Sequence, residues 1–268
     1  MKLSLLITTY NWPRALELTL LSVSRQTVLP DEVVIADDGS TSDTKQMINA
    51  IRTNFPVPII HVWQQDNGYQ RTLILNEAIR QASFEYLVQV DGDIILHPHF
   101  IKDHKSVSQQ GFFIKGSRAL LNQQATHQAL EAQHTRFGFL SAGLANRLNA
   151  LRIPFLAPLF FYKDTNSIRG LIGCNMAFWK TDFIAVNGYN NDIVGWGRED
   201  SELAVRFINR GIKKKRAKLL SICYHMYHAY VSRDNDARNT AMLNEAMAAG
   251  RTTCNNGYQQ VNKTIVYK

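Results

Sequence analysis

Short apolar runs alternate with segments of helical periodicity through the amino-terminal part of the chain. The runs that predict buried strands cover residues 3–8, 32–36, 59–62 and 86–90. After the first run, Asn11 is placed to cap a helix, and Pro13 lies where a helix tolerates proline. This alternation is typical of α/β proteins, in which crossover helices connect the strands of a mostly parallel sheet.

An acidic loop follows the second predicted strand. The sequence DDGSTSD begins with Asp37 and Asp38, and its Gly, Ser and Thr residues indicate a loop. Ligands of open α/β sheets bind at the carboxyl ends of the strands. The sequence therefore predicts a ligand-binding loop at Asp37 and Asp38.

The fourth predicted strand ends in two aspartates around one glycine. Asp91 and Asp93 would point out of the end of the sheet, and Gly92 lets a charged ligand approach the backbone closely. Hard oxygen ligands suit Mg²⁺ or Mn²⁺, which fill their other positions with water and substrate phosphates. An ordinary Asp-Gly turn has the same sequence, so the tripeptide alone leaves both interpretations open.

A second acidic pair, Glu199 and Asp200, begins a predicted helix that ends at Gly211. A helix N-terminus stabilises ionised carboxylates, so one of the pair could act as a general base. The preceding Gly-Trp-Gly segment supplies Trp196, an aromatic ring on which a sugar can stack. The alternative is that both carboxylates only compensate the helix dipole.

Composition narrows the class of protein. With 268 residues and 45% hydrophobic residues, the chain is expected to form one globular catalytic unit. The formal charge of +8 favours anionic partners, and the basic run at residues 212–218 follows a helix end, as a solvated edge would. Three widely spaced cysteines without a CxxC pair favour a reducing cytoplasm over a disulfide framework or a zinc site. The first apolar run is too short for a signal peptide.

Residues 123–162 combine helical sections with an apolar, basic run. Arg147, Arg152 and two prolines argue against a transmembrane helix. One interpretation is a surface helix that lies on a membrane or covers an acceptor site. The other is a core helix followed by a loop.

Six segments carry a resemblance to a known family. They are ITTYN, VIADDGSTSD, QDNGYQRTLILNEAI, the DGD strand, GLIGCNMAFWK and GWGREDSEL, in this order. Together they resemble inverting, nucleotide-sugar-dependent glycosyltransferases with the GT-A fold, a Rossmann-like α/β fold. The first half is similar to bacterial enzymes that build polysaccharides and lipopolysaccharide, and the second half to the galactosyltransferase-type module of chondroitin-type polymerases.

The resemblance implies a single GT-A domain over residues 1–268. Its nucleotide-binding half would cover residues 1–115, its acceptor and catalytic half residues 116–240, and a carboxyl-terminal tail residues 241–268.

The resemblance also implies roles for the residues that match the family motifs. Asp38 would accept hydrogen bonds from the nucleoside base, with Asp37 close by, and Arg71 would meet the base or the diphosphate. The other residues implied to line the donor site are Thr8 and Tyr10 at the nucleoside, Asn175 and Met176 at the donor sugar, and Trp196 at both sugars.

Asp91 and Asp93 match the DXD motif of the family, which holds Mn²⁺ or Mg²⁺. Asp93 is the implied direct ligand, and Asp91 would reach the ribose or a metal-bound water. His225 or His228 would complete the site, and His228 is favoured because the family's histidine usually follows a strand and precedes a polar loop.

Asp200 is the implied catalytic base, with Glu199 beside it in acceptor binding. The expected reaction is metal-dependent, inverting transfer from a nucleotide sugar, UDP-linked by first preference, to a glycan or lipid-linked saccharide. The protein is expected in the cytoplasm, with peripheral contact to the inner membrane and no nucleic-acid partner. A metal-dependent nucleotidyl or phosphoryl transferase would also use the DGD carboxylates, but it would not require the GWGRED segment.

Overall fold

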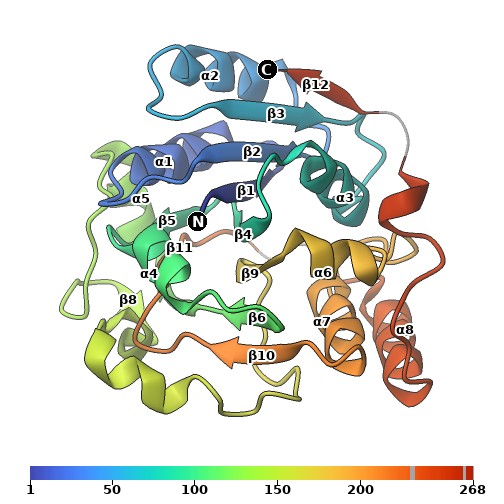
Figure 1. The fold of residues 1–268 in the computed structure, drawn as a ribbon. Coiled ribbons are helices and arrows are strands. Elements are labelled where there is room, and N and C mark those ends of the chain that lie inside the picture. The colour runs from blue at the N-terminus through green and yellow to red at the C-terminus, as the bar shows by residue number, and fades with distance from the viewer. Residues whose placement is uncertain (230–232, 262–263, 268) are drawn as a thin grey trace.

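A computed structural model of the chain describes residues 1–229, 233–261 and 264–267. An eight-stranded sheet forms its centre, with helices on both faces (Figure 1). Four parallel strands contain the four apolar runs: β1 (Leu3–Thr9), β2 (Glu32–Asp37), β3 (Ile59–Trp63) and β4 (Tyr86–Asp91). The α/β fold class predicted from the sequence is confirmed.

The second half of the chain extends this sheet beyond β4. β9 (Asn175–Trp179) runs antiparallel to β4 and to β6 (Phe112–Lys115), and β10 (Lys213–Arg216) pairs parallel with β6. At the opposite end, β12 (Ile265–Tyr267) pairs antiparallel with β3. The sheet order is therefore β10-β6-β9-β4-β1-β2-β3-β12, and residues 265–267 belong to it. The division of the chain at residues 115 and 240 stays a prediction.

The outer side of β10 is covered by the chain itself. The backbone N–H groups of Lys214 and Arg216 donate to the carbonyl oxygens of Thr165 and Phe161, at 2.8 and 3.0 Å. The segment before β9 thus satisfies the outward-facing donors of this edge strand.

A smaller sheet begins where β4 ends. Its order is β5 (Ile94–Leu96), β11 (Ile222–His225), β7 (Ser117–Leu121) and β8 (Leu144–Ala145). β11 runs antiparallel to β5 and pairs His225 with Ile94, so the end of β11 lies beside the DGD turn.

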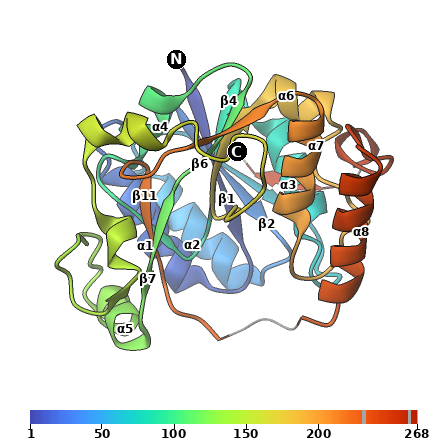
Figure 2. The same ribbon diagram turned by 90° about the horizontal axis from the view of Figure 1, so that it is seen from below.

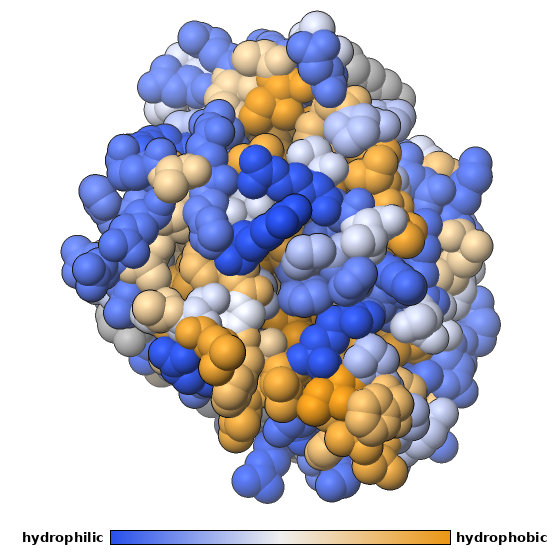
Figure 3. Space-filling view, turned by 90° about the vertical axis from the view of Figure 1, so that its left-hand side faces the viewer, coloured by the Kyte–Doolittle hydropathy of each residue, from blue (hydrophilic) through white to orange (hydrophobic). Residues whose placement is uncertain are grey.

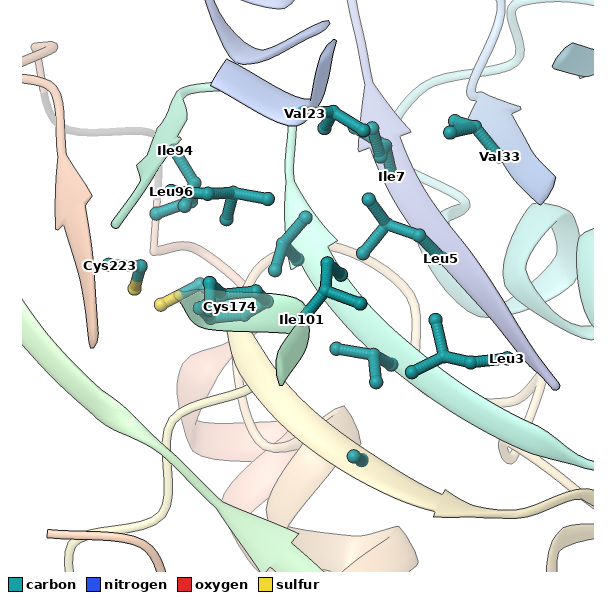
Figure 4. Close-up of a cluster of buried hydrophobic side chains, with 14 of the residues drawn as sticks. Leu3, Leu5, Ile7, Val23, Val33, Ile94, Leu96, Ile101, Cys174 and Cys223 are labelled. Atoms are coloured by element: carbon teal, nitrogen blue, oxygen red, sulfur yellow. The ribbon is translucent and has the colours of Figure 1, made fainter. Parts of the chain in front are cut away.

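Helices cover both faces of the large sheet because the side chains of each strand alternate between them. α1 (Pro13–Ser24), α2 (Ser42–Arg52) and α4 (Phe100–Val107) lie on one face, and α3 (Arg71–Gln81), α6 (Lys180–Ala185) and α7 (Glu199–Asn209) on the other. A hydrophobic core lies under each group of helices. In β1, Leu3, Leu5 and Ile7 point into the core under α1, α2 and α4 (Figure 4), whereas Leu6 belongs to the core under α3, α6 and α7. α8 (Asp236–Ala248) packs against the outside of α7 (Figure 2).

A buried ion pair fixes α7 from within. Arg206 donates to both carboxylate oxygens of Glu202, at 2.9 and 2.6 Å, and to the carbonyl of Val186 at 2.6 Å. The side chains of Glu202 and Arg206 are 3% and 0% exposed. Their contacts therefore connect the helix that begins at Glu199 to the segment after α6.

The expected cap of α1 is wrong. The N-cap position is Trp12, and no side chain caps the helix, although Pro13 is its first residue. Asn11 instead accepts a hydrogen bond from the N–H of Thr41 at 2.9 Å. It thereby connects the end of β1 to the acidic loop after β2.

Residues 123–162 form several short elements. α5 (Gln123–Glu131) is followed by β8 and by the 3₁₀ helices η1 (Arg147–Ala150) and η2 (Pro154–Phe160). The apolar part thus forms neither the single surface helix nor the core helix considered above. Phe155, Leu159 and Leu148 are 80%, 68% and 65% exposed. Among the described residues, no helix has the length and apolar character needed to cross a bilayer.

Candidate active site

Arg71 contacts side chains at the ends of two strands and at the start of α7. It begins α3 and donates to Thr8 Oγ1 at 2.7 Å and to Asp91 Oδ1 at 2.6 Å, and its Nε lies 3.5 Å from Glu199 Oε1. Thr8 also donates to Asp91 Oδ1 at 2.9 Å. Burial would raise the pKa of Asp91, but the charge and hydrogen bond of Arg71 hold it below the usual value. Asp91 is therefore an ionised carboxylate that is already partnered by protein groups.

Asp93 lies with two histidines in an arrangement that can hold a metal ion. Its Oδ2 is 3.5 Å from His225 Nε2 and 3.3 Å from His228 Nε2, and the three ligand atoms all lie within 4.8 Å of one another. Asp93 Oδ1 is buried and finds no hydrogen-bond partner among the residues that the structure describes. Burial raises the pKa of Asp93. A carboxylate with one oxygen that lacks a donor and the other beside two imidazoles fits a bound cation.

The geometry brings both candidate histidines to Asp93. His225 is the last residue of β11, and His228 lies three positions further along. His228 Nδ1 lies 2.7 Å from the carbonyl of Ala229, a contact that leaves Nε2 toward Asp93. The choice between the two, which the sequence left open, need not be made, because both lie within reach of one ion.

Asp200 is half-buried in the first turn of α7 and held by two polar side chains. Tyr189 Oη donates to Asp200 Oδ1 at 2.8 Å, and Gln89 Nε2 lies 3.3 Å from the same oxygen. A Cβ on Gly173 would be 1.6 Å from Asp200 Oδ2, so the carboxylate occupies space that a side chain would need. Burial raises the pKa of Asp200, and the charge of Arg71 opposes that rise.

Glu199 precedes Asp200 and shares its surroundings. Burial and then the charge of Asp200 raise the pKa of Glu199 to about 7, against the influence of Arg71. Arg198, just before it, has a positive φ of 75°, so the chain turns sharply into α7 here. Two carboxyl groups with raised pKa values at one sheet edge are typical of functional sites.

The acidic loop after β2 contains two buried aspartates with different hydrogen-bond partners. Asp38 accepts from Gln64 Nε2 at 2.5 Å and from the N–H of Gln70 at 2.9 Å, and burial raises its pKa to about 6. Asp37 is buried, lies 2.8 Å from His61 Nε2 and accepts from the N–H of Ser40 at 2.8 Å. Asp37 therefore shapes the loop, whereas Asp38 connects it to the segment between β3 and α3.

A hollow of about 360 Å³ adjoins this loop at the β3 side of the large sheet. It is lined by Gln64, Gln65, Asp66, Asn67, Gln70, Leu73, Val261 and Thr264. Tyr10 is 53% exposed and donates to Asp66 at 3.0 Å, so its ring lies at the rim of the loop. The hollow thus borders the acidic loop, and neither Asp93 nor Asp200 lines it.

Of the three residues predicted to border the sugars, one lies at the surface and two lie in the core. Trp196 is 37% exposed, and the guanidinium of Arg233 lies 4.8 Å from its ring centroid. Asn175 and Met176 in β9 are fully buried. The amide of Asn175 donates to the carbonyls of Ser117 and Ser221, at 3.0 and 2.7 Å. In this structure neither β9 side chain reaches an open surface.

Sequence reasoning missed the groups that position Asp200. Gln89 is a polar residue in the middle of the apolar run of β4, and Tyr189 is a fully buried tyrosine before α7. A glutamine inside a buried strand needs a hydrogen-bond partner, and this signal was readable from the sequence. The sequence alone did not show that position 173 needs a glycine.

Two family models match the chain. The model described as glycosyl transferase family 2 matches residues 4–183, and the model described as N-terminal domain of galactosyltransferase matches residues 158–229. The first covers more than half of the chain, including the DGD turn. The second covers Trp196, Asp200 and both histidines, in the half of the chain where the sequence resembled a galactosyltransferase-type module.

Curated relatives are also similar to this chain. A validoxylamine A glucosyltransferase of Streptomyces hygroscopicus subsp. limoneus is 27% identical, over 78% of this chain and 48% of its own length. A chondroitin synthase of Escherichia coli is 23% identical, over 78% of this chain and 32% of its own length. The chain thus spans about half or less of the length of these two relatives.

Solved structures share the fold. TarS of S. aureus, residues 1–349 in complex with UDP, aligns with a TM-score of 0.62 at 15% identity, covering 93% of this chain and 68% of that chain. The mannosyltransferase PcManGT from Pyrobaculum calidifontis, in complex with GDP-Man and Mn²⁺, aligns with a TM-score of 0.57 at 17% identity, covering 88% and 59%. With its GT-A fold and a family match over most of its length, the chain belongs to glycosyltransferase family 2.

Proposed function

We propose that the chain is a metal-dependent, inverting glycosyltransferase that moves a sugar from a UDP-linked donor to a saccharide or lipid-linked saccharide. One observation carries this proposal. A single sheet edge holds a cluster of metal-ligand atoms (Asp93, His225 and His228) and a half-buried, hydrogen-bonded carboxylate, Asp200. The first can hold a cation against a diphosphate, and the second can accept a proton.

Asp93, His225 and His228 would hold the metal. The two imidazoles favour a transition ion such as Mn²⁺ over Mg²⁺, which takes oxygen ligands. When bound, the ion supplies positive charge that stabilises a leaving nucleoside diphosphate. Asp91 faces this site but is occupied by Arg71 and Thr8, so its role is to keep Arg71 in place beside the diphosphate.

Asp200 would take the proton of the acceptor hydroxyl as that oxygen attacks the anomeric carbon. Tyr189 and Gln89 hold one carboxylate oxygen, which fixes the orientation of the group. Attack on the side opposite the leaving group gives a product of inverted configuration. Glu199, with its pKa raised to about 7, would bind the acceptor next to the base, and Trp196 would border the two sugars.

The nucleoside would bind at Asp38, whose carboxylate accepts from N–H donors in the structure and could accept one from uracil. TarS, similar in fold, has been solved in complex with UDP and with UDP-GlcNAc, and PcManGT with GDP-Man and Mn²⁺. These complexes support a nucleotide-sugar donor. The residues between β6 and β9, which include short 3₁₀ helices with exposed apolar side chains, would select the acceptor.

The test is a screen of nucleotide sugars for nucleoside diphosphate release, with Mn²⁺ and with chelator. We expect Mn²⁺-dependent release with a UDP-sugar, and its loss in Asp93→Ala. Asp43→Ala, which removes an exposed aspartate at the start of α2, is the matched control and should behave as wild type. Metal-independent release, or wild-type activity in Asp93→Ala, would overturn the metal assignment.

We also propose peripheral contact with the cytoplasmic face of the inner membrane through η1 and η2. Figure 3 shows apolar atoms gathered among hydrophilic groups at the lower end of this side of the molecule, where residues 147–160 lie in Figure 1. Lys163 and Lys218 lie 5.1 and 5.6 Å from the ring centroid of Phe160. Apolar side chains beside cations suit an anionic bilayer surface. Phe155→Ser with Leu159→Ser should abolish co-sedimentation with anionic vesicles, and unchanged binding would contradict this contact.

A further inference from the structure

A row of aligned residues extends from the anchor of Asp200 to a group of cations. In the large sheet, Gln89 of β4 is paired with Met176 of β9, Met176 with Lys115 of β6, and Lys115 with Arg216 of β10. Residues that are paired directly across strands point to the same face of a sheet. Lys115 and Arg216 therefore point to the face on which Gln89 contacts Asp200. With about 4.8 Å between neighbouring strands, the backbone of Lys115 is about 10 Å from that of Gln89.

Arg118 joins these cations from the start of β7. Its guanidinium lies 3.6 Å from Cys174 Sγ, and Cys174 follows Gly173, the residue whose backbone lies against the carboxylate of Asp200. The basic cluster (Lys115, Arg118 and Arg216) is thus continuous with the surroundings of the proposed base. It lies on the β6 side of Asp200, away from Asp38 and the nucleoside loop.

No carboxylate forms an ion pair with the cluster within the part of the chain that the structure describes. The side chains of Lys115 and Arg216 make no hydrogen bond or ion pair there. The Arg118 guanidinium donates to the thiol of Cys174, and the charge of Asp91, which is already paired with Arg71, is one of the smaller influences that raise the pKa of Arg118. All three side chains are half-buried, so water screens them incompletely. Burial, and after it the charges of Arg216, Lys214 and Arg118, lower the pKa of Lys115 to about 8. An anion placed among the three would relieve this repulsion.

We propose that Lys115, Arg118 and Arg216 form a subsite for an anionic group carried by the acceptor, a carboxylate or a phosphate. The inference rests on the proposed function, because it takes Asp200 as the group that meets the acceptor hydroxyl. An acceptor bound at Asp200 would place its anionic group on the same face of the sheet, toward β6 and β10. Two guanidinium groups suit either oxyanion, which each can bind through paired N–H donors.

The experiment measures binding of three probes to protein saturated with UDP and Mn²⁺, so that the diphosphate site is filled. The probes are glucose, glucuronate and glucose 1-phosphate, and calorimetry gives their dissociation constants. We expect one or both anionic probes to bind more tightly than glucose, with an affinity that falls as KCl is raised. Preference for glucuronate identifies a carboxylate, and preference for glucose 1-phosphate identifies a phosphate.

Variants connect this preference to the cluster. Lys115→Met and Arg216→Met should each raise the dissociation constant of the preferred anionic probe about tenfold or more, as expected for losing a charge-assisted hydrogen bond. Lys115→Arg should retain binding. Lys213→Met is the control, because it removes the same charge from an exposed residue of β10, the strand that carries Arg216. UDP affinity, measured for each variant, reports that it is folded.

Equal affinity for glucose and both anionic probes would overturn the subsite, and so would wild-type affinity in Lys115→Met and Arg216→Met. Failure of the proposed function has a different signature, because UDP would then not bind to the wild-type protein. In that event the comparison of Lys115→Met with Lys213→Met, made without UDP, still decides whether the cluster binds anions.

Discussion

The buried ion pair of α7 gives a prediction whose size follows from the structure. Arg206→Met removes the donor of both hydrogen bonds to Glu202 and leaves a carboxylate that is only 3% exposed. An unpaired buried charge typically costs about 3–5 kcal/mol of unfolding free energy. For a chain of this size, that loss corresponds to a fall in Tm of about 6–20 °C. The methionine fills much of the same volume, so the loss is attributable to the charge and its hydrogen bonds.

Urea unfolding followed by circular dichroism, with Tm from calorimetry, measures this effect. The double variant Glu202→Met/Arg206→Met should be more stable than Arg206→Met alone, because no uncompensated charge remains. Arg14→Met is the matched control. It breaks an ion pair with Glu131 in which both side chains are more than half exposed, and it should cost less than about 1 kcal/mol. If Arg206→Met cost no more than Arg14→Met, the reasoning about burial would be refuted.

Three further predictions concern the site. Asp200→Asn should lower kcat about 10²–10⁴-fold while UDP affinity, measured by calorimetry, stays nearly unchanged; Glu199→Gln should act mainly on the acceptor KM. If Asp200→Asn lost UDP binding in parallel, the base would have to be sought elsewhere. Gly173→Ala should reduce kcat similarly, because its Cβ would lie 1.6 Å from Asp200 Oδ2, whereas Gly138→Ala, with no neighbour within 4 Å, should be silent. Folding raises the pKa of Asp38 from 3.8 to about 6, so its contribution to stability falls as pH rises between these values and stays lost above them. Relative to wild type, Asp38→Asn should therefore gain about 2 kcal/mol between pH 4 and pH 7, and a pH-independent difference would contradict this assignment.

The sequence predicted the amino-terminal part of the fold closely because local patterns determine it. The apolar runs coincide with β1 to β4 within a residue or two, since each strand is buried on both faces and reads as continuous hydrophobic sequence. The acidic loop and the DGD turn follow directly from where those strands end. Periodicity also found α7 and its carboxylates.

The rest could not be predicted because it depends on contacts between distant segments. His225 reaches Asp93 only through the pairing of β11 with β5, and no local pattern in the sequence specifies that pairing. Asn175 matched a family motif, but its amide donates to carbonyl groups at the start of β7 and in the turn before β11. The exposed apolar side chains at residues 148–159 follow from short 3₁₀ turns, which hydrophobic periodicity does not distinguish from a helix.

Both ends of the large sheet are protected, and this has a consequence for how the molecule behaves at high concentration. A strand with free backbone donors is a template on which a second molecule can add its own strand. At one end, the segment carrying Phe161 and Thr165 takes the outward donors of β10, whose sequence is Lys-Lys-Lys-Arg. At the other, the three-residue β12 shields β3. Strand-to-strand growth into fibrils is thereby opposed at one border by repulsion between like charges and at the other by the shortness of the last strand. A truncation that removed residues 265–267 would expose β3, and self-association through that strand would follow.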